Sequence, residues 1–307
     1  CTDDCHSGTL VNDGHMNRVV RHAIDCGCDP LIAIQMATIN TACHFGMERE
    51  LGSITPGRRA DFIVTSSIDY LPIDVVFARG ERVAENGKLL TKCPHYQWPQ
   101  TVRKTVNLGK KLERKDFMIS APIGLSSVKA KVIGVIENQA PTKALEFNLP
   151  VEQGNVQLEG DVCYLSLVER HRGTGAVVNG FVSGFGYTES MAIASSVAHD
   201  SHHMIVVGTN QEMMASAANR LGEVGGGVSL WKDGSEVALV ELPIAGLMSD
   251  SNASEVADKA QAIVSAMIDC GCTLNNAYMQ HTLLALVVIP ELRISDLGLV
   301  DVNRFEL

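Results

Sequence analysis

Two short stretches near the start of the chain carry apolar residues at helical spacing. The first ends at Cys26, where Gly27 stops it, and either Asn12 or Asp13 can cap its start. Its expected buried stripe consists of Val19, Val20, Ala23 and Ile24. The pattern therefore predicts an amphipathic helix over roughly residues 13–26.

A second helix is expected directly after the first. Asp29 can cap it, Pro30 suits its first position, and Gly46 ends it. Its apolar positions are Leu31, Ile34, Met36, Ala37 and Ala42. Two capped helices thus follow a short β-prone run at the start of the chain that closes with Asp3 and Asp4.

From Leu51 the helical spacing gives way to short β-prone runs. We expect strands over residues 60–66, 73–79 and 82–90, with a hairpin at Gly80-Glu81 joining the last two. These runs predict a small β module. The polar stretch that follows, residues 92–115, is interpreted as a linker or the edge of this module.

The remainder of the chain mixes strand and helix patterns. Expected strands cover residues 131–136, 161–168, 175–182, 203–207, 228–232 and 236–242, the last two joined at Asp233-Gly234. One helix is expected over 211–224, after Asn210 and before Gly225-Gly226-Gly227, and another over 253–269, capped by Ser251 or Asn252. This alternation predicts an α/β or α+β domain.

Composition places the chain among soluble globular proteins. It has 307 residues, 46% of them hydrophobic, and a formal charge of -10, which argues against nucleic acid or an anionic membrane as partner. No apolar run reaches the roughly 18 residues of a spanning helix, so we expect a cytoplasmic protein. The nine cysteines fit reduced thiols. Asp-Cys-Gly-Cys occurs at 25–28 and at 269–272, and we interpret both copies as helix ends rather than as halves of a zinc site.

Asp3 and Asp4 are the first candidates for chemistry. A strand that ends in acids and leads into a loop and a helix is typical of a parallel strand that delivers a carboxylate to an active site. Asp4 would point the other way if the strand persists. The alternative is that the two acids only cap a turn.

A second candidate is the histidine-rich loop, residues 199–203 (His199-Asp200-Ser201-His202-His203). Three histidines beside an acid can form a metal site or an acid/base cluster. Two further interpretations stay open: a structural loop, and a loop that covers a substrate through His199, Asp200, His202 and His203 and shields it from water.

Several of these motifs together resemble a known family. Thr2-Asp3-Asp4 before two helices, followed by Gly-Ser-Ile-Thr-Pro-Gly-Arg-Arg-Ala-Asp-Phe-Ile-Val, resembles the last barrel strand and the following β module of amidohydrolase-superfamily enzymes. The later motifs resemble the carboxyl-terminal domain of bacterial adenine deaminases. They are the segments 197–203, 210–214, 225–227, 242–250, 290–292 and 298–302.

The resemblance implies a mixed α/β and α+β fold in three parts. Residues 1–50 would be a remnant of a (β/α)₈ amidohydrolase barrel, 51–115 part of a small β-sandwich with a linker, and 116–307 a carboxyl-terminal α/β domain. It also implies that the chain is the carboxyl-terminal half of an enzyme, with the amino-terminal barrel half and further copies of itself (a homo-oligomer) as partners.

The implied reaction is the hydrolytic deamination of adenine to hypoxanthine and ammonia in purine salvage. The family uses a divalent metal, Mn²⁺ or Fe²⁺ before Zn²⁺, which lowers the pKa of its bound water to about 7. Asp3 matches the family's metal-adjacent catalytic acid, with Asp4 as a possible second acid. The sequence contains no His-x-His, the family's first pair of metal ligands, so this half is expected to be inactive alone. The alternative is a non-catalytic α/β binding or assembly domain that retains an amidohydrolase tail.

Overall fold

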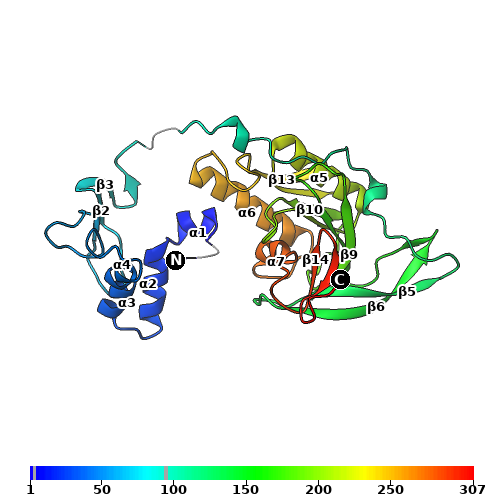
Figure 1. The fold of residues 1–307 in the computed structure, drawn as a ribbon, viewed down its shortest axis with the longest axis horizontal. Coiled ribbons are helices and arrows are strands. Elements are labelled where there is room, and N and C mark those ends of the chain that lie inside the picture. The colour runs from blue at the N-terminus through cyan, green and yellow to red at the C-terminus, as the bar shows by residue number, and fades with distance from the viewer. Residues whose placement is uncertain (3–4, 93–95) are drawn as a thin grey trace. The chain divides into compact units, whose positions relative to one another are not determined.

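The computed structural model describes residues 1–2, 5–92 and 96–307, and Asp3 and Asp4 therefore lie outside the described residues. The chain forms two compact units, Cys1–Gln97 and Trp98–Leu307 (Figure 1). Each unit has its own hydrophobic core.

The first unit begins with four short helices. They are α1 (Ser7–Asn12), α2 (Met16–Asp25), α3 (Pro30–Met36) and α4 (Ile39–His44). The prediction of Asn12 or Asp13 as the cap of the first long helix was wrong, because residues up to Asn12 form a helix of their own and His15 occupies the N-cap of α2. The second expected helix is confirmed at its start, where the Asp29 carboxylate accepts hydrogen bonds from the backbone N–H groups of Leu31 and Ile32. A turn at residues 37–38 divides it into α3 and α4.

A four-stranded antiparallel sheet completes the first unit. It consists of β1 (Phe62–Val64), β2 (Val75–Ala78), β3 (Glu81–Glu85) and β4 (Lys88–Leu89), in that order. The expected strand over 82–90 is interrupted by Asn86 and Gly87, which have φ values of 48° and 74°. Two successive positive φ angles define the tight turn that Asn-Gly favours between paired strands. The run is therefore a hairpin rather than one strand.

The second unit is built on a nine-stranded sheet. Its order is β13-β12-β10-β11-β8-β9-β5-β6-β7, and the only parallel pair among its described strands is β5 with β9. Antiparallel pairing fits the α+β alternative. The strands are β5 (Ser127–Val135), β6 (Thr142–Glu152), β7 (Asn155–Val156), β8 (Val162–Val168), β9 (Val177–Ser183), β10 (Met191–Ser195), β11 (Met204–Gly208), β12 (Gly227–Lys232) and β13 (Ser235–Glu241). The six predicted strands are present within a few residues, whereas β6, β7 and β10 were not predicted.

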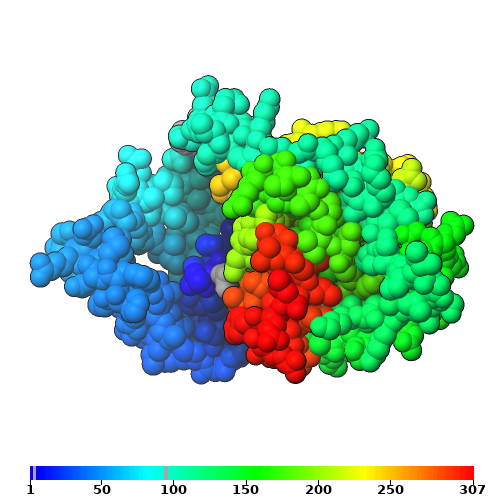
Figure 2. Space-filling view, turned by 45° about the vertical axis from the view of Figure 1, so that its right-hand side comes forward, coloured from blue at the N-terminus to red at the C-terminus, as the bar shows by residue number. Residues whose placement is uncertain are grey.

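Both faces of this sheet are covered. All seven residues of β8 are buried; Cys163 and Leu165 face one core, and Val162 and Tyr164 face the other, as the two-residue period of a strand requires. Helix α5 (Gln211–Val224) packs on the second face. Helices α6 (Ala253–Asp269) and α7 (Ala277–Leu283) pack on the first, together with the C-terminal hairpin of β14 (Leu292–Ser295) and β15 (Gly298–Asp301). In the space-filling view this hairpin (red) lies at the surface of the unit (Figure 2).

The two long helices have the predicted bounds. Asn210 caps α5 through hydrogen bonds from the N–H groups of Glu212 and Met213, and Gly225, with φ of 88°, ends it. Asn252 is the N-cap of α6. The two Asp-Cys-Gly-Cys segments are confirmed as helix ends, since Gly27 and Gly271 follow α2 and α6 with φ of 96° and 99°.

Residues from Trp98 onward belong to the second unit. Leu112 and Phe117 are buried in the core on the α5 face. The Asn219 side chain of α5 fixes Leu112 by accepting from its N–H and donating to its C=O, both at 2.9 Å. Within the described residues, no helix combines the length and the apolarity needed to cross a membrane.

Candidate functional site

The histidine-rich loop connects β10 to β11, and the structure divides its histidines into two groups. His202 has φ of 51°, the left-handed region that side chains other than glycine rarely adopt. The next residue begins the approach to β11, and its side chain leaves the loop in another direction. His199 and His202 therefore form one group, while His203 joins residues from other strands.

His199 and His202 contact each other edge to face, with ring centroids 5.4 Å apart. The backbone N–H of Ala198 donates to Nδ1 of His202 at 3.2 Å. Nδ1 is thus an acceptor, which leaves the proton of the neutral ring on Nε2. Burial lowers the pKa of His202, and the proximity of His199 and Arg170 lowers it further. The ring is neutral at pH 7 and can donate through Nε2. Asp200, the acid of the loop, is exposed.

His203 is buried, at 8% exposure, and faces a different set of residues. Its ring centroid lies 4.8 Å from that of His171, and its Nε2 lies 3.7 Å from a carboxylate oxygen of Asp296, in the turn between β14 and β15. Burial and the proximity of His171 lower the pKa of His203. The nearby carboxylates of Asp296 and Glu169 partly offset this by raising the pKa. A buried histidine is thereby held beside a second histidine and an acid.

Arg170 links the two groups. The residue is almost wholly buried, at 2% exposure. Nε donates to the carbonyl oxygen of His202 at 2.5 Å, and Nη1 donates to that of Ala245 at 3.2 Å. The first bond restrains the residue at which the loop changes direction. Burial lowers the pKa of Arg170, yet an arginine remains charged at neutral pH.

The Arg170 side chain contacts a place where two backbone segments, at Gly226 and Gly246, come close together. A Cβ on Gly226 would come within 2.4 Å of Cα of Gly246, and a Cβ on Gly246 would come within 2.7 Å of Nη1 of Arg170. The hydroxyl of buried Ser196 joins these segments, since it donates to the carbonyl of Gly246 at 2.6 Å and accepts from the N–H of Gly227 at 2.7 Å. Only glycine permits the two backbones to meet beneath the histidine-rich loop.

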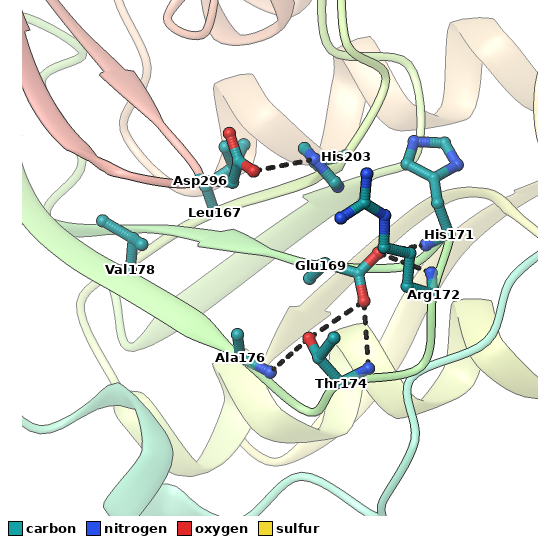
Figure 3. A pocket seen from close by; sticks show the side chains of 9 residues that line it. All are labelled: Leu167, Glu169, His171, Arg172, Thr174, Ala176, Val178, His203 and Asp296. Atoms are coloured by element: carbon teal, nitrogen blue, oxygen red, sulfur yellow. Dashed lines mark hydrogen bonds and ion pairs between the residues drawn. The ribbon is translucent and has the colours of Figure 1, made fainter.

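His203 lines a cavity of about 310 Å³. Its apolar walls are supplied by Leu167 of β8, Val178 of β9 and Ala176, which directly precedes β9 (Figure 3). We call this space the His203 cavity. Its polar side chains are Glu169, His171, Arg172, Thr174, His203 and Asp296.

Glu169 holds the turn that shapes one wall of this cavity. Its carboxylate accepts from the N–H groups of His171, Arg172 and Thr174 and from the Thr174 hydroxyl, at 2.5 to 3.0 Å. Burial alone would raise the pKa of Glu169, but these four donors outweigh it and lower the pKa to about 2. The ionised carboxylate is a structural anchor whose acceptor positions are already used.

Replacing Glu169 by Gln is expected to destabilise the chain in a pH-dependent way. A pKa lowered from 4.5 to about 2 corresponds to at most about 3 kcal/mol. This stabilisation is complete above pH 4.5 and disappears as the pH falls toward 2. Urea unfolding at pH 7 and pH 3 measures it: the gap between wild type and Glu169→Gln should narrow at pH 3. Glu159→Gln, at an exposed position, is the control, and an equal loss at both pH values for Glu169→Gln contradicts the assignment.

The structure offers no metal site in the part of the chain that it describes. Among residues 1–2, 5–92 and 96–307, no three His, Cys, Asp or Glu side chains lie together in a group that could hold a metal ion. The histidine-rich loop therefore lacks the set of ligands that a self-contained metal site would need.

Sequence reasoning found His203 but missed Glu169, Arg170, His171 and Asp296. One signal was available for the first three, because a charged run, Glu169-Arg170-His171-Arg172, directly follows the apolar residues of β8. Polar side chains at the end of a buried strand are natural candidates for a site. No local signal marks Asp296, which reaches the cavity only because the C-terminal hairpin packs on the sheet.

Comparison with known families accounts for both parts of the chain. Residues 1–86 match the family described as "Amidohydrolase family", and residues 139–306 match that described as "Adenine deaminase C-terminal domain". The second match covers more than half of the chain. The chain belongs to the adenine deaminase C-terminal domain family.

Curated relatives agree with this assignment. The chain is 72% identical over 306 residues to "Adenine deaminase" of Roseobacter denitrificans and 72% identical over 309 residues to "Adenine deaminase" of Ruegeria pomeroyi; each match covers 100% of the chain and 51% of the relative. "Adenine deaminase" of Moorella thermoacetica is 44% identical over 308 residues, and this match covers 100% of the chain and 52% of the relative. The chain spans about half the length of the curated relatives it matches.

Proposed function

We propose that the chain is one half of a metal-dependent adenine deaminase, an enzyme that hydrolyses adenine to hypoxanthine and ammonia in purine salvage in the cytoplasm. The observation that carries this proposal is the 72% identity over the whole chain to curated proteins named adenine deaminase. A shared fold alone would be weak support for a shared reaction. Identity at this level, together with the amidohydrolase match over residues 1–86, is stronger support.

The proposal assigns a part to each region of the chain. Residues 1–50 would contribute the end of the barrel, 51–115 part of the β-sandwich and the linker, and 116–307 the carboxyl-terminal domain. The four-stranded sheet at residues 62–89 supports the second assignment, and the family match at 139–306 supports the third.

Asp3 is the residue of this chain proposed to act in the reaction. Hydrolytic deamination adds water to carbon 6 of the purine and delivers a proton to the departing amine. A carboxylate at this position can accept the proton of the water and pass it to the leaving group. Asp4 is proposed as a second acid beside it.

The described residues do not form a site for the expected metal, since they contain no set of three ligating side chains. We therefore propose that most ligands of the divalent metal, Mn²⁺ or Fe²⁺ before Zn²⁺, lie elsewhere in the complete polypeptide, with Asp3 as the contribution of this chain. The 307-residue chain alone should release no ammonia from adenine. Turnover of adenine by the chain alone, or tightly bound metal that Asp3→Ala removes, would show that this division of the site is wrong.

The histidine-rich loop is proposed to cover the substrate. Its support is the exposed or half-buried position of His199, Asp200 and His202, with a neutral His202 ring that can donate from Nε2. A loop held from beneath by Arg170 presents these groups in a fixed orientation.

Alanine at His202 or His203 in the complete enzyme separates the covering-loop and structural-loop interpretations. It also checks the metal-site interpretation, for which the described residues provide no ligand set. A covering loop predicts lower kcat or higher KM with unchanged metal content, because the metal ligands lie elsewhere. An independent metal site predicts a loss of metal per chain, and a structural loop predicts a shift in Tm alone. Metal analysis, steady-state kinetics and thermal unfolding of the same preparations distinguish these results. Unchanged kinetics in both variants would remove these histidines from the site.

A further inference from the structure

The His203 cavity has the size of a small-molecule site, since its volume of about 310 Å³ lies at the lower end of the range for ligand pockets. Six of the nine side chains that line it are polar and three are apolar. Leu167, Ala176 and Val178 supply the apolar surface. Figure 3 shows Asp296 and His203 on one side of the cavity and Thr174 on another, with Arg172 between them in the view.

The charges around the cavity argue against an anionic ligand. Two carboxylates, Glu169 and Asp296, line it with a single guanidinium, that of Arg172, and His203 is held toward its neutral form. Phosphate or a carboxylate would meet more repulsion than attraction here. An uncharged ligand meets no such penalty.

Two side chains of the cavity are positioned to bind a polar ligand edge. The Glu169 acceptors are occupied by the turn, whereas the Asp296 side chain is 50% exposed and 3.7 Å from His203. Arg172 is exposed and forms no ion pair with an acid in the described residues. One carboxylate acceptor and one guanidinium donor thus remain for a ligand that presents both a donor and an acceptor.

The two histidine rings favour a flat ligand. His171 and His203 are tilted by 57° with centroids 4.8 Å apart, and the His171 ring is exposed. Nε2 of His171 donates to the carbonyl oxygen of Ser201 at 2.9 Å, which leaves Nδ1 of the ring for other contacts. Aromatic faces beside an apolar wall bind planar rings by stacking.

We propose that the His203 cavity binds a planar, uncharged nitrogen heterocycle of purine size. Asp296 accepts from an amino group or ring N–H of the ligand, Arg172 donates to a ring nitrogen or carbonyl oxygen, and the ring packs against Leu167 and Val178. The inference deepens the proposed function and rests on it for the choice of purine. It assigns the second unit a base-binding site formed by its own residues.

Isothermal titration of the 307-residue chain with adenine and with hypoxanthine tests this proposal. Saturable binding at one site per chain is expected. Asp296→Asn and Arg172→Gln should each raise Kd about tenfold or more, the usual effect of losing a hydrogen bond to a charged group. Asp258→Asn, at an exposed position on α6, is the matched control and should leave Kd unchanged. Circular dichroism confirms that each variant is folded.

Three results would overturn the inference. They are the absence of saturable binding at about 1 mM base, an equal effect of Asp258→Asn and Asp296→Asn, and displacement of adenine by inorganic phosphate or by glycine, which would indicate an anion site or an amino acid site. None of them bears on the proposed reaction, because ammonia release by the complete enzyme is measured separately. Conversely, base binding with the predicted variant pattern would stand if another purine proved to be the substrate.

Discussion

Asp3→Asn in the complete polypeptide is expected to lower the rate of adenine deamination by about 10²- to 10⁴-fold, the usual cost of losing a positioned proton-transfer group. The substitution keeps the shape of the side chain and removes its basicity, so the fold should be retained. Ammonia release under saturating adenine, with circular dichroism of the same preparation, measures both effects.

Asp4→Asn tests whether the neighbouring residue, proposed as a second acid, takes part in the reaction. Adjacent side chains of a strand point to opposite faces, and Asp4 is therefore expected to matter less than Asp3 if the strand interpretation is right. Activity of Asp3→Asn within about threefold of wild type would remove Asp3 from the catalytic assignment. Equal large losses in both variants would favour two cooperating acids.

Gly226→Ala is expected to destabilise the second unit strongly. The new Cβ would lie 2.4 Å from Cα of Gly246 and 2.9 Å from Oγ of Ser196, at a residue whose φ is 115°. Backbone strain and overpacking each cost about 1–3 kcal/mol, which gives an expected loss of about 2–6 kcal/mol. Urea unfolding of the 307-residue chain measures this loss.

Gly234→Ala separates the two contributions. Gly234 also has a positive φ, 81°, but a Cβ there would meet nothing within 4 Å. The Gly234→Ala variant should therefore lose only the part of the unfolding free energy that comes from backbone strain, about 1–2 kcal/mol. Similar losses for the two variants would mean that the contact between Gly226 and Gly246 contributes little to the stability of this region.

The sequence predicted elements well where local chemistry decides them. Helix α5 begins at Asn210 and ends at Gly225 because a side-chain cap and a left-handed glycine are local devices. The turn at Asp233-Gly234 was found for the same reason. By contrast, β6 mixes charged and apolar residues and contains Pro150, and β10 is a run of only five residues. Both are strands because neighbouring strands pair with them.

The candidate site was predicted in part. The histidine spacing identified His199, His202 and His203, but it could not reveal that the backbone at His202 turns His203 away from the other two. That turn depends on Arg170, whose hydrogen bond to the His202 carbonyl is tertiary. The partners of His203 come from the end of β8 and from the C-terminal hairpin, and only the packed sheet brings them together.

The most direct test of the proposed function is the reaction of the purified complete polypeptide with adenine in the presence of Mn²⁺, Fe²⁺ or Zn²⁺. Hypoxanthine, followed by chromatography, and ammonia, followed by a coupled assay, are measured beside the 307-residue chain alone. We predict equal amounts of the two products from the complete polypeptide and none from the chain. Failure of the metal-loaded complete polypeptide to convert adenine, with its fold intact, would contradict the proposed function and favour a non-catalytic binding or assembly domain.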